Sequence, residues 1–140
     1  MVRQATLDDA EAIIDLTRQL GYQLPDQQIL ANLEEMLNDD RRVVLVLVIE
    51  SQVVGWCTVV ADIAITEPPY ALLSGMVVDE ALRGNGLGRE LLMAAEAWAR
   101  DRGLARIRLR TNLVRAGAQA FYERGGYETV KEQRVYTKAL

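Results

Sequence analysis

The stretch that decides the fold is Met76–Leu92, which reads MVVDEALRGNGLGRELL. An apolar strand at its start passes through three glycines into a helix whose apolar residues recur at helical spacing. Glycine lets the backbone approach a ligand closely, and the start of a helix offers unpaired N–H groups and the positive end of its dipole to an anion. The expected ligand of this turn is therefore a pyrophosphate.

The residues around the glycines exclude two common phosphate-binding loops. A P-loop needs Gly-Lys-Ser/Thr at the start of the helix, whereas here Gly88 is followed by Arg89 and Glu90. A dinucleotide-binding fingerprint needs a further glycine three residues after its second one, and that position holds Arg89 in one register and Leu91 in the other. Neither loop fits.

A third pattern, Arg/Gln-x-x-Gly-x-Gly/Ala, is matched by Arg83, Gly86 and Gly88. This turn resembles the acyl-coenzyme A loop of the GNAT superfamily of N-acetyltransferases. About thirty residues further along, Arg115–Tyr127 (RAGAQAFYERGGY) resembles the closing helix of the same family, Ala-x-x-Phe-Tyr-Glu-x-x-Gly-Phe/Tyr. The opening segment, Val2–Ala10, is also typical of the family. The resemblance therefore spans nearly the whole chain.

The resemblance implies a single N-acetyltransferase domain over residues 1–140. Its fold class would be α/β (α+β), with a mixed and mostly antiparallel sheet of about six to seven strands flanked by about four helices. The sheet would be splayed between the strand that ends near Val78 and the strand near Ile107. The gap would hold the pantetheine arm of the coenzyme.

Hydrophobic periodicity and turn residues predict the elements independently. Thr6 is the expected cap of the first helix. The strand at Arg106–Arg110 follows a crossover helix, so it should run parallel to the strand ending at Val78. Helices are predicted at about 8–20, 25–37 and 86–102, and strands at about 2–5, 42–49, 52–65, 70–78, 106–110 and 132–138.

Composition limits the classes of function. The chain of 140 residues is half hydrophobic, which suits one domain, and it has no histidine, which removes imidazole triads and the usual zinc or iron sites. No metal is therefore expected. A net charge of −4 argues against a nucleic-acid partner. The only cysteine, Cys57, lies in a strand pattern that indicates a core position.

The chain also carries no sign of a membrane segment. Its longest apolar run, Val43–Ile49, is far shorter than the roughly 20 residues of a membrane-spanning helix. The N-terminus has no basic segment followed by an apolar one, as a secretory signal would. We expect no membrane partner and a cytoplasmic location.

The resemblance implies that acetyl-CoA is the cosubstrate and that an amine of a small molecule or peptide attacks its thioester directly, without a metal. It also implies that Tyr122 is the general acid for the departing thiolate. The implied coenzyme-binding residues lie on the strand edge, in the turn and on the closing helix. They are Met76, Val77, Val78, Arg83, Gly84, Asn85, Gly86, Leu87, Gly88, Arg89, Arg115 and Tyr122.

The general base is left open by the sequence. Many family members carry glutamate on the strand before the turn, but the matching positions hold Leu72 and Ser74. An amine near pKa 10 would lose its proton through water at Ser74 or to a loop carboxylate, Glu67 or Asp62, unless the acceptor already binds as a neutral amine. The missing glutamate motivates an alternative, a catalytically weak or inactive acyl-CoA-binding module.

The acceptor and the oligomeric state are also open. Tyr22, between the first two helices, and Tyr70 are candidate acceptor contacts, although a surface position alone would explain either tyrosine. Similar proteins often form homodimers, and the predicted strand at Glu132–Lys138 would be available for such an interface.

Overall fold

The sheet takes its strands in chain order, β1-β2-β3-β4-β5. The first four strands pair in antiparallel succession, and β5 joins β4 in the parallel sense, as the crossover connection predicted. β2 begins and ends where the sequence predicted. The strands are β1 (Val2–Gln4), β2 (Arg42–Ile49), β3 (Gln52–Ala64), β4 (Glu67–Val78) and β5 (Ile107–Leu109).

The computed structural model describes residues 1–111 and 116–140, and it divides into two compact units. The first unit, Met1–Arg110, contains the sheet, and the second unit is Thr111–Leu140. A single domain over residues 1–140 stays a prediction. The helices are α1 (Ala10–Arg18), α2 (Asp26–Leu37) and α3 (Leu87–Asp101) in the first unit and α4 (Ala116–Arg124) in the second.

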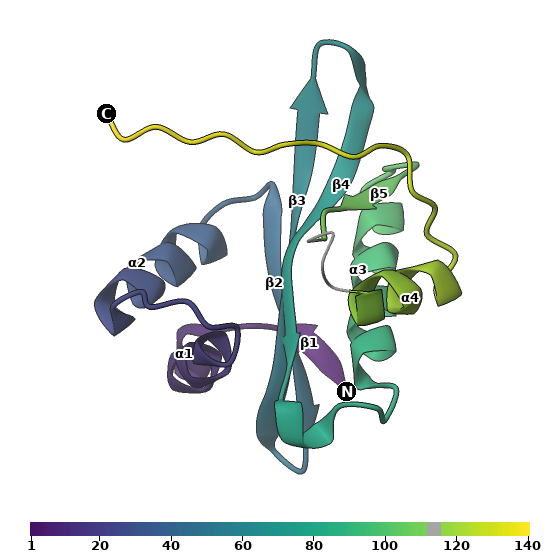
Figure 1. The fold of residues 1–140 in the computed structure, drawn as a ribbon. Coiled ribbons are helices and arrows are strands. Elements are labelled where there is room, and N and C mark those ends of the chain that lie inside the picture. Colours follow the sequence, from purple (N-terminus) through teal and green to yellow (C-terminus); the bar gives the residue numbers. More distant parts are fainter. Residues whose placement is uncertain (112–115) are drawn as a thin grey trace. The chain divides into compact units, whose positions relative to one another are not determined.

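Helices cover both faces of the sheet in the first unit (Figure 1). α1 and α2 lie against one face, and α3 lies against the other. The core cluster on the first face consists of buried side chains from the chain start, both helices and β2: Ala5, Ile13, Leu33, Val44 and Val46. On the α3 face, Leu91 is fully buried. Because both faces are covered, the central residues of β2 are buried without alternation.

The mixed α/β fold with four helices is confirmed, but the strand count is not. The described residues form five strands rather than six to seven. The strand expected at Glu132–Lys138 is wrong, because residues 128–140 form no helix or strand. A segment with strand-forming residues becomes a strand only when a neighbouring strand supplies hydrogen bonds. Val135 and Tyr136 of this segment are 89% and 84% exposed.

A capping box begins the short 3-10 helix η1 (Leu7–Asp9), which connects β1 to α1. The Thr6 hydroxyl accepts a hydrogen bond from the Asp8 N–H at 3.3 Å, and the Asp9 carboxylate accepts one from the Thr6 N–H at 2.9 Å. Arg3 donates to both Asp9 oxygens at 2.8 and 2.9 Å. Asp9 is only 6% exposed. The hydrogen bonds from Arg3 hold the pKa of the Asp9 carboxyl below its ordinary value of 3.8.

Asp9→Asn should lower the free energy of unfolding at neutral pH by about 2 kcal/mol, because charge-assisted hydrogen bonds to a buried carboxylate are lost. A carboxyl whose pKa is lowered on folding stabilises the protein above its unfolded pKa, and that contribution disappears as pH falls through the folded pKa. The difference between Asp9→Asn and the unmodified chain should therefore shrink between neutral pH and about pH 2 in urea unfolding.

The exposed neighbour supplies the control for this measurement. Asp8→Asn should change stability by less than about 0.5 kcal/mol, since its carboxylate is at the surface. A loss in Asp9→Asn that is equally large at both pH values would contradict the ionic origin of the effect.

Candidate functional site

The turn between β4 and α3 adopts the backbone that its glycines allow. Gly84 and Gly86 have φ angles of +87° and +77°, which side-chain-bearing residues rarely adopt. Gly86 is the N-cap of α3, and no side chain caps this helix end. The first N–H groups of α3 have no partner within the helix, so they are available to an anion.

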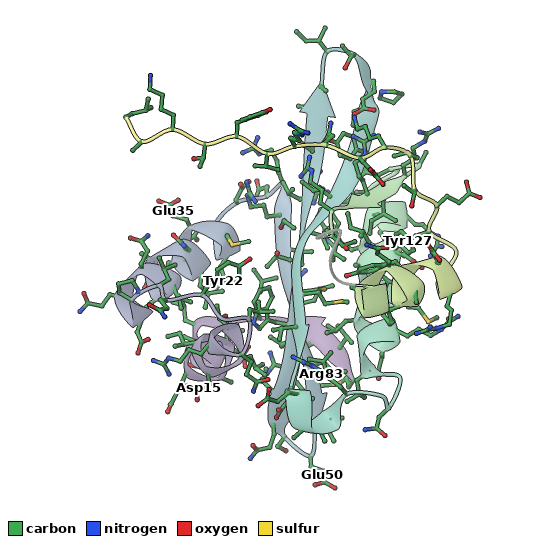
Figure 2. All side chains as sticks on the ribbon, in the orientation of Figure 1. Asp15, Tyr22, Glu35, Glu50, Arg83 and Tyr127 are labelled. Carbon is green, nitrogen blue, oxygen red and sulfur yellow. The ribbon has the colours of Figure 1, made fainter. Side chains whose placement is uncertain are left out.

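The space in front of these glycines is open. A Cβ added to Gly84 or Gly86 would meet no atom within 4 Å. Arg83 and Arg89 are exposed at the two ends of the turn, and Figure 2 shows Arg83 between β4 and α3. The Arg83 Nε donates to the carbonyl oxygen of Val78 at 3.4 Å. Exposed N–H groups, a helix start and two guanidinium groups fit a diphosphate.

The side chain of Gln19, just after the end of α1, holds the start of the connection between β4 and α3 in place. The Gln19 Oε1 accepts a hydrogen bond from the Glu80 N–H at 2.9 Å, and its Nε2 donates to the Asp79 Oδ1 at 3.4 Å. The Asp79 N–H donates to the carbonyl oxygen of Val54 at 2.8 Å. Sequence reasoning missed Gln19, because nothing near it in the chain indicates a partner sixty residues away.

The pairing of β4 with its neighbouring strands changes at Ser74. β5 pairs with β4 from Ala71 to Leu73, and among the described residues its ladder goes no further. The β3–β4 register jumps there, because Thr58 pairs with Gly75 while Val59 pairs with Leu73. Ser74 is therefore the extra residue of a β-bulge. Within the described residues β4 has no parallel partner beyond this bulge, and the splay of the sheet expected between β4 and β5 stays a prediction.

The residues expected to bind the pantetheine arm lie along this edge. Met76 is partly exposed, while Val77 and Val78 are buried. Ser74 is exposed, and its Oγ lies 2.8 Å from the Thr58 Oγ1. The roles assigned to these residues stay predictions.

Glu67 and Tyr70 belong to one polar cluster at the end of β3 and the start of β4. Glu67 and Asp62 lie on these strands, so their predicted placement on a loop is wrong. Glu67 accepts hydrogen bonds from both terminal nitrogens of Arg108, at 2.8 and 2.9 Å. The Arg108 guanidinium lies 4.1 Å from the centre of the Tyr70 ring. The Tyr70 hydroxyl donates to the Asp62 Oδ2 at 3.0 Å. The hydrogen bonds with Glu67 raise the pKa of Arg108.

This cluster bears on two untested predictions. Glu67 would have to leave Arg108 before it accepted a proton. Tyr70 is only 6% exposed, so it is not the surface residue that the sequence suggested as the simplest interpretation. Tyr22, by contrast, is 68% exposed on the connection between α1 and α2 (Figure 2). Both tyrosines remain candidate acceptor contacts.

The second unit contains the closing-helix motif. Tyr122 is half-buried on α4. Its ring forms T-shaped contacts with those of Phe121 and Tyr127, with centroid distances of 5.1 and 5.9 Å. The Tyr127 N–H donates to the carbonyl oxygen of Tyr122 at 3.1 Å, beyond the end of the helix. Arg115, predicted to contact coenzyme, lies outside the described residues.

Residues 1–111 and 116–140 contain no group of three or more His, Cys, Asp or Glu side chains placed to hold a metal ion. No helix in this part of the chain is both long enough and apolar enough to cross a membrane.

Cys57 is the sole thiol, and it lies in the core as predicted. Its side chain is fully buried on the α3 face, with the Sγ 4.0 Å from the carbonyl oxygen of Leu91. Burial raises the pKa of the Cys57 thiol to about 12. Because the thiolate is the reactive form, Cys57 is unsuited to be a nucleophile.

The folded protein should therefore react with a thiol reagent such as iodoacetamide at least about 100-fold more slowly than the urea-unfolded chain at pH 8. Mass spectrometry of timed samples would measure both rates. Equal rates in the two states would show that Cys57 is accessible and would contradict the buried placement.

Comparison with known proteins identifies the class. Residues 9–127 match the acetyltransferase (GNAT) family. The chain is 32% identical over 130 residues to the IAA acetyltransferase of Azospirillum brasilense, covering 91% of this chain and 82% of that protein. It is 31% identical over 140 residues to the aminoglycoside N(6')-acetyltransferase type 1 of Stenotrophomonas maltophilia, covering 96% and 90%. The chain belongs to the acetyltransferase (GNAT) family.

A solved structure supports the fold. An aminoglycoside N-acetyltransferase in complex with coenzyme A superposes with a TM-score of 0.91 at 22% sequence identity. The match covers 100% of this chain and 95% of that one. At this identity the likeness concerns the fold alone.

Proposed function

We propose that this protein transfers an acetyl group from acetyl-CoA to a primary amine of a small molecule or peptide, by direct attack in a ternary complex. The observation that carries the proposal is the β4–α3 region, where the part of β4 beyond its described pairing with β5 leads into an exposed, glycine-built helix start. Family membership and the relatives add support. One solved neighbour, with a TM-score of 0.90, holds a bisubstrate analogue that joins coenzyme A to monomethyl-acetylneamine.

The turn would bind the coenzyme diphosphate through backbone N–H groups between Gly84 and Arg89. Each charge-assisted hydrogen bond contributes about 1.5–3 kcal/mol, so several of them would dominate affinity. The pantetheine arm would pair with the β4 edge at Met76–Val78. Acetyl-CoA supplies the activated thioester, and this chain's part is to hold and orient it.

In the transfer step, the amine nitrogen forms a bond to the acetyl carbonyl carbon while the carbon–sulfur bond breaks. A backbone N–H at Val77 or Val78 would polarise the carbonyl oxygen. Tyr122 would give its hydroxyl proton to the thiolate, since a phenol with a pKa near 10 is protonated at neutral pH. No covalent bond to the protein is required.

The acceptor amine must lose a proton, and Ser74, Asp62 and Glu67 are the groups proposed to help remove it. Ser74 is exposed at the bulge and could order a water, and Asp62 is a partly exposed carboxylate. Glu67 is paired with Arg108. This pairing, with no glutamate at positions 72 and 74, favours the second candidate function, a weak or inactive acyl-CoA-binding module. Release of free thiol with a panel of primary amines would separate the two.

A cytoplasmic location and a homodimer remain part of the proposal. Neither a metal nor a nucleic-acid or membrane partner is assigned to the reaction, and the amine itself is the proposed small-molecule or peptide partner.

Gly86→Ala tests coenzyme binding at the turn. A non-glycine residue at φ +77° should cost about 1–2 kcal/mol of stability, and a Cβ at the helix start should raise the acetyl-CoA Kd about tenfold or more. Calorimetry measures the Kd, and thermal melting measures stability.

Acetyl-CoA at about 100 times its Kd should stabilise the unmodified chain by about 2.7 kcal/mol.

Gly103→Ala is the matched control. Gly103 has a φ of +73°, open space around its Cβ position and a place at the other end of α3. The same stability loss with an unchanged acetyl-CoA Kd is expected. If both variants bind acetyl-CoA as the unmodified chain does, the turn is not the diphosphate site.

Tyr122→Phe tests the general acid. It should lower kcat by roughly 10- to 1000-fold, because the thiolate loses its proton donor, while the acetyl-CoA Kd stays within a few-fold. Steady-state release of free thiol with an accepted amine measures kcat. Tyr127→Phe, which removes the hydroxyl of a neighbouring ring, is the control and should retain turnover. Unchanged kcat in Tyr122→Phe would remove this residue from the mechanism.

A further inference from the structure

At its bulge, β4 lies against the side chain of Trp56, which leaves room only for glycine at position 75. Trp56 is on β3 and pairs with Val77. Thr58, two residues further along β3, pairs with Gly75. A Cβ added to Gly75 would lie 2.9 Å from the Trp56 Cζ3, 3.2 Å from its Cη2 and 3.3 Å from the Thr58 Oγ1. The indole therefore occupies the space that any side chain at residue 75 would need.

The indole cannot readily move out of the way. Trp56 packs against the buried cluster on the α1–α2 face, whose members include Val44 and Val46. Close-packed interiors resist such shifts, because every displaced side chain must find new space. The Trp56 Nε1 is buried and has no hydrogen-bond partner in the part of the chain that the structure describes. Within the described residues this partly buried indole is therefore held by packing, and its N–H is unpaired.

A pair of hydroxyl groups also contacts the bulge, next to the indole. The Ser74 Oγ lies 2.8 Å from the Thr58 Oγ1 and donates to the Thr58 carbonyl oxygen at 3.4 Å. Ser74 is the extra residue of the bulge, and the β5 ladder ends one residue before it, at Leu73. The indole, Gly75 and the hydroxyl pair thus meet at the point where β4 leaves β5.

We propose that the contact between Trp56 and Gly75 positions the outer edge of β4 for the pantetheine arm of the coenzyme. Trp56 and Gly75 are positioning residues, since they act through the backbone of residues 74–78 and not by touching a reacting atom. This inference rests on the proposed function. It deepens that function by identifying what sets the strand edge on which the arm would lie.

The test compares two ligands that differ only in the arm. Coenzyme A would contact both the turn and the β4 edge, whereas adenosine 3′-phosphate 5′-diphosphate retains the diphosphate and lacks the arm. Gly75→Ala should raise the Kd for coenzyme A about tenfold, since the Cβ pushes the strand away from the indole. The Kd for the truncated ligand should stay within about twofold, because the turn is unchanged. Calorimetry measures both.

A double-mutant cycle tests the contact between Trp56 and Gly75 directly. Trp56→Phe removes the ring atoms that crowd residue 75, so this single variant should also weaken coenzyme A binding selectively. In Gly75→Ala/Trp56→Phe the new methyl group fills part of the vacated space, and affinity for coenzyme A should recover toward that of the unmodified chain. Trp56→Phe also keeps the test available if Gly75→Ala does not fold.

Ile13→Val is the control for lost stability. It removes a methylene group from the core cluster on the same face, and both ligands should bind it as they bind the unmodified chain. Two results would overturn the inference: unchanged coenzyme A binding in the folded single variants, or equal weakening of both ligands. An unmodified chain that binds neither ligand would overturn the proposed function, and this inference with it.

Discussion

The structure depends on an unequal pairing of β4. Its inner edge pairs with β3 almost throughout, while β5 follows its outer edge only from Ala71 to Leu73. The extra residue Ser74 lies directly after the part of β4 that pairs with β5. A bulge of this kind bends and twists the strand that contains it. Among the described residues, β5 pairs with β4 only on one side of this bulge. The edge proposed for the pantetheine arm therefore begins where the β3–β4 register shifts.

Glycine has two distinct physical roles in this region. At Gly84 and Gly86 the requirement is conformational, since both have positive φ and open space where a Cβ would be. At Gly75 the requirement is steric, because the Trp56 ring already fills that space. The first role gives the turn its left-handed backbone, and the second allows a strand to lie close to an aromatic ring.

Local patterns predicted much of the fold. The glycine spacing identified the strand–turn–helix unit, the helical periodicity located α3, and the crossover rule gave the parallel sense of β5. The sequence did not reveal Gln19 or the Trp56–Gly75 contact, which join residues distant in the chain and leave no periodic signal. The strand predicted at the C-terminus failed for a related reason, because strand formation depends on a partner as well as on propensity.

The candidate site was predictable in part. The turn has the conformation that its motif suggests, but the role of each predicted residue still requires experiment. The isolation of Cys57 has a practical consequence for such work. Since the sole thiol is buried and protonated at physiological pH, a cysteine introduced at the exposed position of Tyr22 would accept a fluorophore selectively in the native state. The protein is therefore suited to single-dye fluorescence titration without prior removal of its own cysteine.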